Sequence, residues 1–150
     1  MSDLKDKIKA AIISNNVSEA VECIDLYVKQ GGKIDDPLAN PPEAEKNWNL
    51  LFWASLCDSD QVLNHILTNY NVKIDPVDTT GYTPLHLAAF HGKLNCVKIL
   101  IEHGADLSKA STYGETLYEL VIQRPYLQGD NLEIKEFIQK KLAERGLLRS

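Results

Sequence analysis

Apolar residues recur at three- and four-residue spacing in a series of short stretches along this chain, with polar residues between them. The sharpest example lies at residues 84–102. The first half of this segment has an apolar face of mostly small side chains, made of Leu85, Ala88 and Ala89. The second half has a stripe of aliphatic side chains, made of Leu94, Val97, Leu100 and Ile101. Because this spacing places the apolar side chains on one face of a helix, it predicts two short helices that bury those faces against neighbours.

Turn and capping residues mark where these two helices begin and end. The segment Asp78–Gly81 suits a type I turn, since Asp favours the first position of that turn and Gly the last. Thr83 can cap the next helix by accepting a hydrogen bond from the amide three residues on, and Pro84 fits the first helical position. Gly92 and Gly104 can adopt the left-handed conformation that closes each helix.

The same arrangement recurs about 33 residues downstream and about 34 residues upstream. Downstream, Thr116 and Glu119 have the spacing of a capping box, so a helix start is expected there. Upstream, Asn49 is suited to cap residues 50–55, and Asn71, at the end of the next apolar stripe, is expected to be left-handed. Two weaker stripes in the first 28 residues add another copy. The chain thus divides into four expected units, at about 3–36, 48–77, 78–110 and 111–146.

The run Gly81-Tyr82-Thr83-Pro84-Leu85-His86-Leu87-Ala88-Ala89, together with this period, resembles the ankyrin repeat. The resemblance covers almost the whole chain, but only the unit at 78–110 is close to consensus. It implies an all-α fold, namely an ankyrin-repeat solenoid of helix-turn-helix units with hairpin-like connecting loops. We therefore expect a single domain over residues 1–150, in which each short helix is stabilised by stacking on its neighbours.

Two segments depart from the repeat pattern. Residues 36–47 contain three prolines and two glutamates, and this segment is longer than the usual turn, so an extended loop is expected. Residues 124–129, Arg-Pro-Tyr-Leu-Gln-Gly, cannot continue a helix and predict a long loop between the two helices of the last unit.

Composition and charge exclude some partners. The formal net charge of −5 over 150 residues argues against a nucleic-acid-binding protein that neutralises phosphates. Residues 10–78 hold eleven acidic and four basic side chains, a net charge of −7. This acidic half could steer a basic partner, or it could serve only solubility; the sequence leaves both readings open.

The expected location is the cytoplasm, the nucleus or both. Three cysteines are too few, and odd in number, for a disulfide framework, which favours a reducing compartment. The first residues lack the apolar core of a signal peptide, and no apolar stretch approaches membrane-spanning length. We expect a monomer that binds neither nucleic acid nor membrane.

No arrangement of residues predicts catalysis, a metal or a cofactor. The four histidines lack partners at the spacing of a metal site, and in the resemblance His86 has a structural role within the turn. Ser55 has no nucleophile-elbow context, and Gly31-Gly32 lacks the residues of a phosphate-binding loop. Trp53 is expected in the core. The sequence therefore indicates a protein that is not an enzyme.

The resemblance implies a concave binding surface made of hairpin tips and the exposed positions of the first helices. Aromatic residues in this set are typical of interface hot spots. For Phe90 and Trp48, packing against neighbouring units is the alternative. The expected partner-binding residues are Trp48, Thr79, Thr80, Tyr82, Phe90, His91, Thr112, Tyr113, Glu115, Gln123 and Arg124.

Several functions fit this picture. The main hypothesis is a protein–protein interaction module, such as an adaptor, inhibitor or assembly factor. A narrower version is an acidic, chaperone-like shield for a basic client protein. Remoter alternatives are a small enzyme or ligand binder using residues 124–130, and an oligomerising piece that exposes Leu147-Leu148 and the uncharged helix of the second unit.

Overall fold

The structure is a computed structural model, in which residues 2–36, 48–121 and 132–146 are described. These residues form eight α-helices and confirm the expected all-α fold. In chain order the helices are α1 (Ser2–Ile13), α2 (Val17–Lys29), α3 (Leu50–Leu56), α4 (Asp60–Asn69), α5 (Pro84–Phe90), α6 (Leu94–Glu102), α7 (Leu117–Val121) and α8 (Leu132–Glu144).

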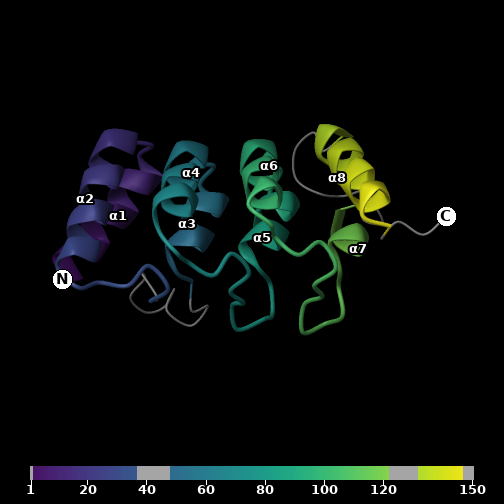
Figure 1. The fold of residues 1–150 in the computed structure, drawn as a ribbon, viewed down its shortest axis with the longest axis horizontal. Coiled ribbons are helices and arrows are strands. Elements are labelled where there is room, and N and C mark those ends of the chain that lie inside the picture. Colours follow the sequence, from purple (N-terminus) through teal and green to yellow (C-terminus); the bar gives the residue numbers. More distant parts are fainter. Residues whose placement is uncertain (1, 37–47, 122–131, 147–150) are drawn as a thin grey trace.

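The helices stand in antiparallel pairs arranged in one row from the N-terminus to the C-terminus (Figure 1). Helix α3 packs on α5 and α5 on α7, while α2 packs on α4 and α4 on α6. The loops that lead into α5 and α7 project to one side of the row. This stacking of paired helices is the arrangement that the repeat pattern predicts.

The core runs along the row between the two layers of helices. Ala54 and Ala88 are completely buried, and their small side chains let consecutive first helices approach closely. Trp53 is buried, as expected. The second-unit helix α3, however, buries Leu50–Ser55 between its neighbours, so the expectation that this uncharged helix is exposed is wrong. Leu147 and Leu148 lie outside the described residues.

The first helix of each of the first three pairs ends in the same way. Amide groups of Asn16, Ser59 and Lys93 donate to the carbonyls of Ala11, Ala54 and Ala88, each at 2.8 Å. This bond spans five residues and requires a left-handed residue just before the donor. Those left-handed residues are Asn15, Asp58 and Gly92, with φ of 59°, 58° and 76°.

The second helices end less uniformly. Gly31 and Gly104 are left-handed, each with φ of 96°. The prediction of a left-handed Asn71 is wrong, because Tyr70 already leaves the helix in extended backbone, with φ of −128° and ψ of 147°. That conformation lets the Tyr70 hydroxyl donate to the Asp25 carboxylate on α2, so a side-chain contact replaces the glycine turn.

The expected caps are present. The Thr83 hydroxyl accepts from the His86 amide at 3.2 Å, and Pro84 is the first residue of α5. Asn49 accepts from the Leu51 amide at 2.9 Å, which starts α3. At α7, the Glu119 amide donates to the Thr116 hydroxyl at 3.3 Å. Each cap satisfies a backbone donor that the first turn leaves without an intrahelical partner.

Candidate functional site

The loop before α5 is organised by the carboxylate of Asp78. The Gly81 amide donates to the Asp78 carbonyl at 3.0 Å, closing the turn that the sequence predicts. One carboxylate oxygen, Oδ1, accepts from the Thr80 amide at 2.8 Å, from the Thr80 hydroxyl at 2.5 Å and from the Tyr82 amide at 3.1 Å. Asp78 is only 6% exposed, so a buried negative charge is held by neutral donors at the base of this hairpin.

Trp48 is fixed beside this turn. Its indole Nε1 donates to the second Asp78 oxygen, Oδ2, at 3.0 Å. The ring stacks on Phe52 with centroids 6.2 Å apart, and it meets the edge of Trp53 at 5.5 Å. Trp48 remains half-buried, so it packs on the core and also presents ring surface to solvent.

The next hairpin lies directly alongside. Its Thr112 amide donates to the Thr80 carbonyl at 3.1 Å. The Tyr82 hydroxyl donates to Glu115 Oε1 at 2.6 Å, which ties the two hairpins together through their side chains. In this second hairpin Ser111 takes the place of Asp78, and its hydroxyl accepts from the amides of Tyr113 and Glu115.

A hollow of about 240 Å³ opens between these hairpins and the first helices. It brings together five residues expected to contact a partner: Trp48, Thr80, Tyr82, Phe90 and His91. Four lining residues were not in the expected set: Asp78, His86, Leu87 and Leu120. Asp78 and His86 have structural roles in the turn that the sequence predicts, and these roles account for both residues without a partner.

The remaining expected residues fall elsewhere. Thr79 and Thr112 are exposed on the hairpins, and Tyr113, at 71% exposed, projects from a hairpin tip. Glu115 is engaged by Tyr82 within the protein. Gln123, Arg124 and the remainder of the 124–130 loop lie outside the described residues, as do residues 37–47.

Both histidines that line the hollow favour the neutral form. Burial lowers the pKa of His86; its Nδ1 accepts from the Thr83 amide at 3.2 Å, and its Nε2 donates to the Lys109 carbonyl at 3.0 Å. Burial, and then the nearby Lys93 ammonium, lower the pKa of His91. The His91 ring meets the edge of Phe90 with centroids 5.1 Å apart. At neutral pH neither ring adds positive charge to the hollow.

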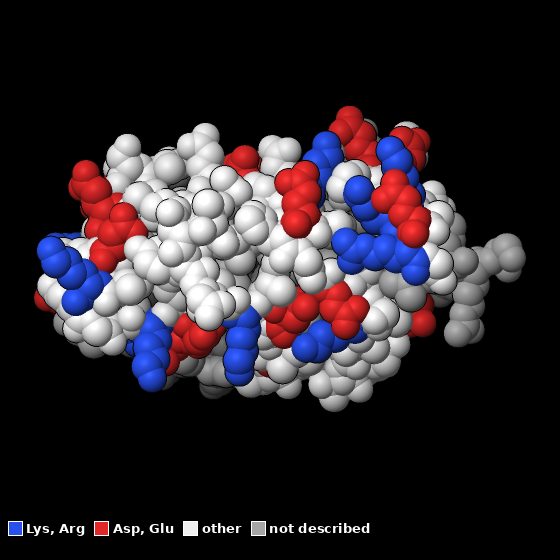
Figure 2. Space-filling model, viewed as in Figure 1, with Lys and Arg blue, Asp and Glu red and all other residues white. Residues whose placement is uncertain are grey.

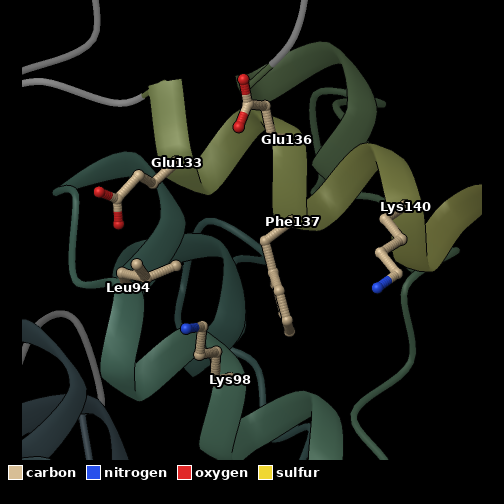
Figure 3. Close-up of a pocket in the computed structure, with 6 residues that line it drawn as sticks. All are labelled: Leu94, Lys98, Glu133, Glu136, Phe137 and Lys140. Atoms are coloured by element: carbon tan, nitrogen blue, oxygen red, sulfur yellow. The ribbon is translucent and has the colours of Figure 1, made fainter.

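A second hollow, of about 280 Å³, lies between α6 and α8. Figure 3 shows Phe137 pointing from α8 toward α6, close to Lys98. The ammonium groups of Lys98 and Lys141 lie 5.6 and 5.5 Å from the Phe137 ring centroid. Two lysines and two glutamates line this hollow, namely Lys98, Lys140, Glu133 and Glu136. Its charges balance, and the contacts around Phe137 serve to pack α8 on α6.

A polar cluster joins α2 to α4 through Asp25. Its carboxylate accepts from Tyr70 and from His65 Nε2, the latter at 3.0 Å. These two hydrogen bonds, with Tyr70 the stronger, lower the pKa of Asp25. Burial, aided by the bond to Asp25, raises the pKa of the Tyr70 hydroxyl to about 12. At neutral pH Asp25 is therefore ionised and Tyr70 protonated, and their hydrogen bond links two helix pairs.

Other groups offer no chemistry within the part of the chain that the structure describes. Burial raises the pKa of the Cys23, Cys57 and Cys96 thiols, which disfavours the reactive thiolate. No three potential metal ligands come together among the described residues, and none of their helices is long and apolar enough to cross a membrane.

Charge is unevenly distributed over the face seen in Figure 2. The surface around the middle helix pairs is largely free of charged side chains, whereas acidic and basic groups gather over α8 and along the loop side. The sequence of α3 and of α5 contains no charged residue at all, and α4 contains only Asp60.

A family model for ankyrin repeats, in three copies, matches residues 8–111. Among curated proteins, the chain is 29% identical over 106 residues to Delta-latroinsectotoxin-Lt1a of Latrodectus tredecimguttatus, covering 71% of this chain and 8% of that protein. It is 37% identical over 71 residues to Ankyrin repeat protein OPG189 of monkeypox virus, covering 43% and 13%. It is 41% identical over 64 residues to Ankyrin repeat and SOCS box protein 12 of Mus musculus, covering 39% and 21%. The chain thus spans only a small part of the length of these relatives.

Proposed function

Because this chain belongs to the ankyrin repeat family, we propose that it is a non-enzymatic protein–protein interaction module that holds a partner in the groove between its hairpins and first helices. Repeats of this family typically mediate protein binding. The observation that carries the proposal is the hollow that Trp48, Tyr82 and Phe90 line together. Such side chains supply much of the energy of protein interfaces.

Contacts within the protein already hold the aromatic side chains of the groove in place without a partner. Trp48 is held by Asp78 and the rings of two core residues, and Tyr82 is held by Glu115. A partner would therefore lose little free energy in ordering these side chains, which favours binding by a preformed surface. An adaptor, an inhibitor or an assembly factor would each use such a surface.

Quantitative affinity capture tests the proposal. The wild-type protein and a groove variant, Tyr82→Ala with Tyr113→Ala, would be used as baits in lysate of the source organism. A matched control, Glu133→Gln with Glu136→Gln, changes the α6–α8 hollow instead. We expect partners that are retained by the control and lost by about tenfold or more from the groove variant. Equal recovery by all three baits would contradict the proposal.

A second candidate is an acidic, chaperone-like shield for a basic client protein. The net charge of −7 over residues 10–78 favours it, as does the Asp78 carboxylate in the hollow. Because exposed charges are screened by salt, client binding should weaken strongly as salt rises. A client affinity that does not change with salt would rule out this candidate without contradicting the proposal of an interaction module.

A further inference from the structure

The hollow has aromatic walls and a carboxylate in its lining. Trp48 precedes α3, Tyr82 precedes α5 and Phe90 ends α5, so the walls come from different elements. Rings of this kind attract cations through their negative faces, and groups of aromatic residues are a known means of holding ammonium groups. Asp78 adds a full negative charge at the same place.

Among the described residues, no lysine or arginine of the hollow offsets the charge of Asp78. Both histidines that line the hollow favour the neutral form. The four donors to Asp78 are amide, hydroxyl and indole groups, which hydrogen-bond to the charge without cancelling it. Two charged residues flank the hollow: Glu115 next to Tyr82, and Lys93 next to His91. Their charges have opposite signs, so together they add no net charge beside the hollow.

This charge decides between an apolar and a cationic guest. An apolar side chain in the hollow would remove the remaining solvent from the Asp78 carboxylate and supply no counter-charge, which is unfavourable. A cationic side chain would place its methylene stem on the rings and its charge near Asp78. The volume of about 240 Å³ is below that of pockets for drug-sized ligands and suits one side chain.

We propose that the hollow lined by Trp48, Tyr82, Phe90 and Asp78 binds the side chain of an arginine or lysine presented by a segment of the partner protein. The proposal rests on the proposed function and names the chemistry of the partner at that site. Positive charge on the guest, rather than its apolar surface, is the main source of selectivity.

Small model compounds test this directly. N-acetyl-arginine amide and N-acetyl-citrulline amide have nearly the same shape, but only the first is charged. Each is titrated into the labelled protein while the two indole N–H resonances are followed by NMR, with Trp48→Phe used to assign the Trp48 signal. We expect the arginine compound to bind at about millimolar affinity, about tenfold tighter than citrulline, and to shift the Trp48 signal. Equal affinity of the two compounds, or no shift at Trp48, would overturn the proposal.

A lysine pair extends the same comparison. N-acetyl-lysine amide should bind more tightly than its Nε-acetylated form, because acetylation removes the charge and keeps the stem. The preference should change little as salt is added, because Asp78 is only 6% exposed and salt screens buried charges much less than exposed ones. A stronger response to the acetylated form would count against a cation site.

Matched variants locate the interaction. Phe90→Leu keeps an apolar side chain but removes a ring from the wall, and Phe137→Leu makes the same change in the α6–α8 hollow. We expect Phe90→Leu to reduce the preference for arginine over citrulline, because one ring is lost while Asp78, Trp48 and Tyr82 remain, and Phe137→Leu to keep it in full. Asp78→Asn removes the charge, but it also places an amide against the Trp48 indole. Its thermal unfolding is therefore compared with that of the wild type first, and its binding data then serve as supporting evidence. Full discrimination by a folded Phe90→Leu protein would refute the assignment to this hollow.

The two proposals can fail separately. If the groove variant loses a captured partner while arginine and citrulline bind alike, the cation site is wrong and the interaction module stands. If arginine is preferred but capture is unchanged in the groove variant, the hollow binds cations and the partner is held elsewhere.

Discussion

His86 joins helix α5 to the following hairpin through both nitrogens of a neutral ring. The ring is 2% exposed, and burial lowers its pKa from the ordinary value of 6.5. Its folded-state pKa is therefore below its unfolded-state pKa, and below about pH 6.5 the unfolded chain binds more protons at this residue than the folded one. The stabilising contribution of this burial is complete above that pH and is lost progressively as the pH falls toward the folded-state value.

Replacing His86 tests this linkage. We expect His86→Gln to lower the free energy of unfolding by about 1–3 kcal/mol at neutral pH, because buried backbone groups lose their partners. We also expect it to reduce the fall in stability between about pH 6.5 and pH 5. Urea unfolding at several pH values measures both effects. His103→Gln is the control, since His103 is exposed and its ring contacts Asn64 at 3.4 Å on the surface. A pH dependence unchanged in His86→Gln would refute the account.

Individual residues were predictable where the chemistry is local. The turn at Asp78–Gly81, the Thr83 cap and Pro84 follow from conformational preferences within a few positions. The bonds from Trp48 to Asp78 and from Tyr82 to Glu115 could not be read in this way, because they join positions 30 and 33 residues apart. For the same reason the sequence predicts that Glu115 contacts a partner, whereas its bond to Tyr82 depends on how one hairpin lies on the next.

At the scale of elements, the turn between the two helices of a pair has a left-handed residue at the same place in each of the first three pairs. Asp58 and Asn15 occupy the left-handed position that Gly92 occupies in the third pair. Asp and Asn tolerate this conformation better than other residues that have a Cβ, but less well than glycine. The signal in the sequence is an Asn or Asp two residues after the first helix of each of the first two pairs.

This position offers a way to stabilise the protein. We expect Asp58→Gly to raise the free energy of unfolding by up to about 1 kcal/mol, because glycine adopts the left-handed conformation without steric cost. Asp58→Ala should lower it by about 1 kcal/mol, since alanine keeps the Cβ and lacks the local hydrogen-bonding group. Chemical denaturation of both variants gives the comparison. Destabilisation by glycine as large as that by alanine would show that the Asp58 side chain has another role.

The two hairpins give a second matched comparison. Both Gly81 and Gly114 are left-handed, with φ of 82° and 75°. A Cβ added at Gly81 would lie 2.4 Å from the Thr112 nitrogen, whereas one added at Gly114 would meet nothing within 4 Å. We therefore expect Gly114→Ala to cost about 1 kcal/mol for conformation alone, and Gly81→Ala to cost about 1–3 kcal/mol more for the overlap. Equal losses of stability on urea unfolding would show that the hairpins separate easily.

At the scale of the whole molecule, the repeat period predicts the stack but not the groove. Recurring pairs of amphipathic helices bury their apolar faces when they stack in a row, because each pair then covers the apolar face of the next. The hollow instead depends on residues from successive pairs, among them Trp48, Phe90 and Leu120, and on the spacing of two hairpins. Residues that depart from the repeat consensus at these positions preserve the stacking of the helices but change the surface that the stack exposes.

Because neighbouring pairs share one core, loss of packing in one pair should weaken the others. Leu100 on α6 is completely buried, while both tryptophans of the chain, Trp48 and Trp53, lie at or within α3 of the preceding pair. We expect Leu100→Ala to cost about 2–5 kcal/mol. The transition reported by tryptophan fluorescence should shift by the same amount as the one reported by helix circular dichroism, if the stack unfolds as one unit. A fluorescence midpoint that stays in place while the circular dichroism midpoint falls would instead show that the pairs unfold separately, and that a partner could bind to one part of the stack while another part is open.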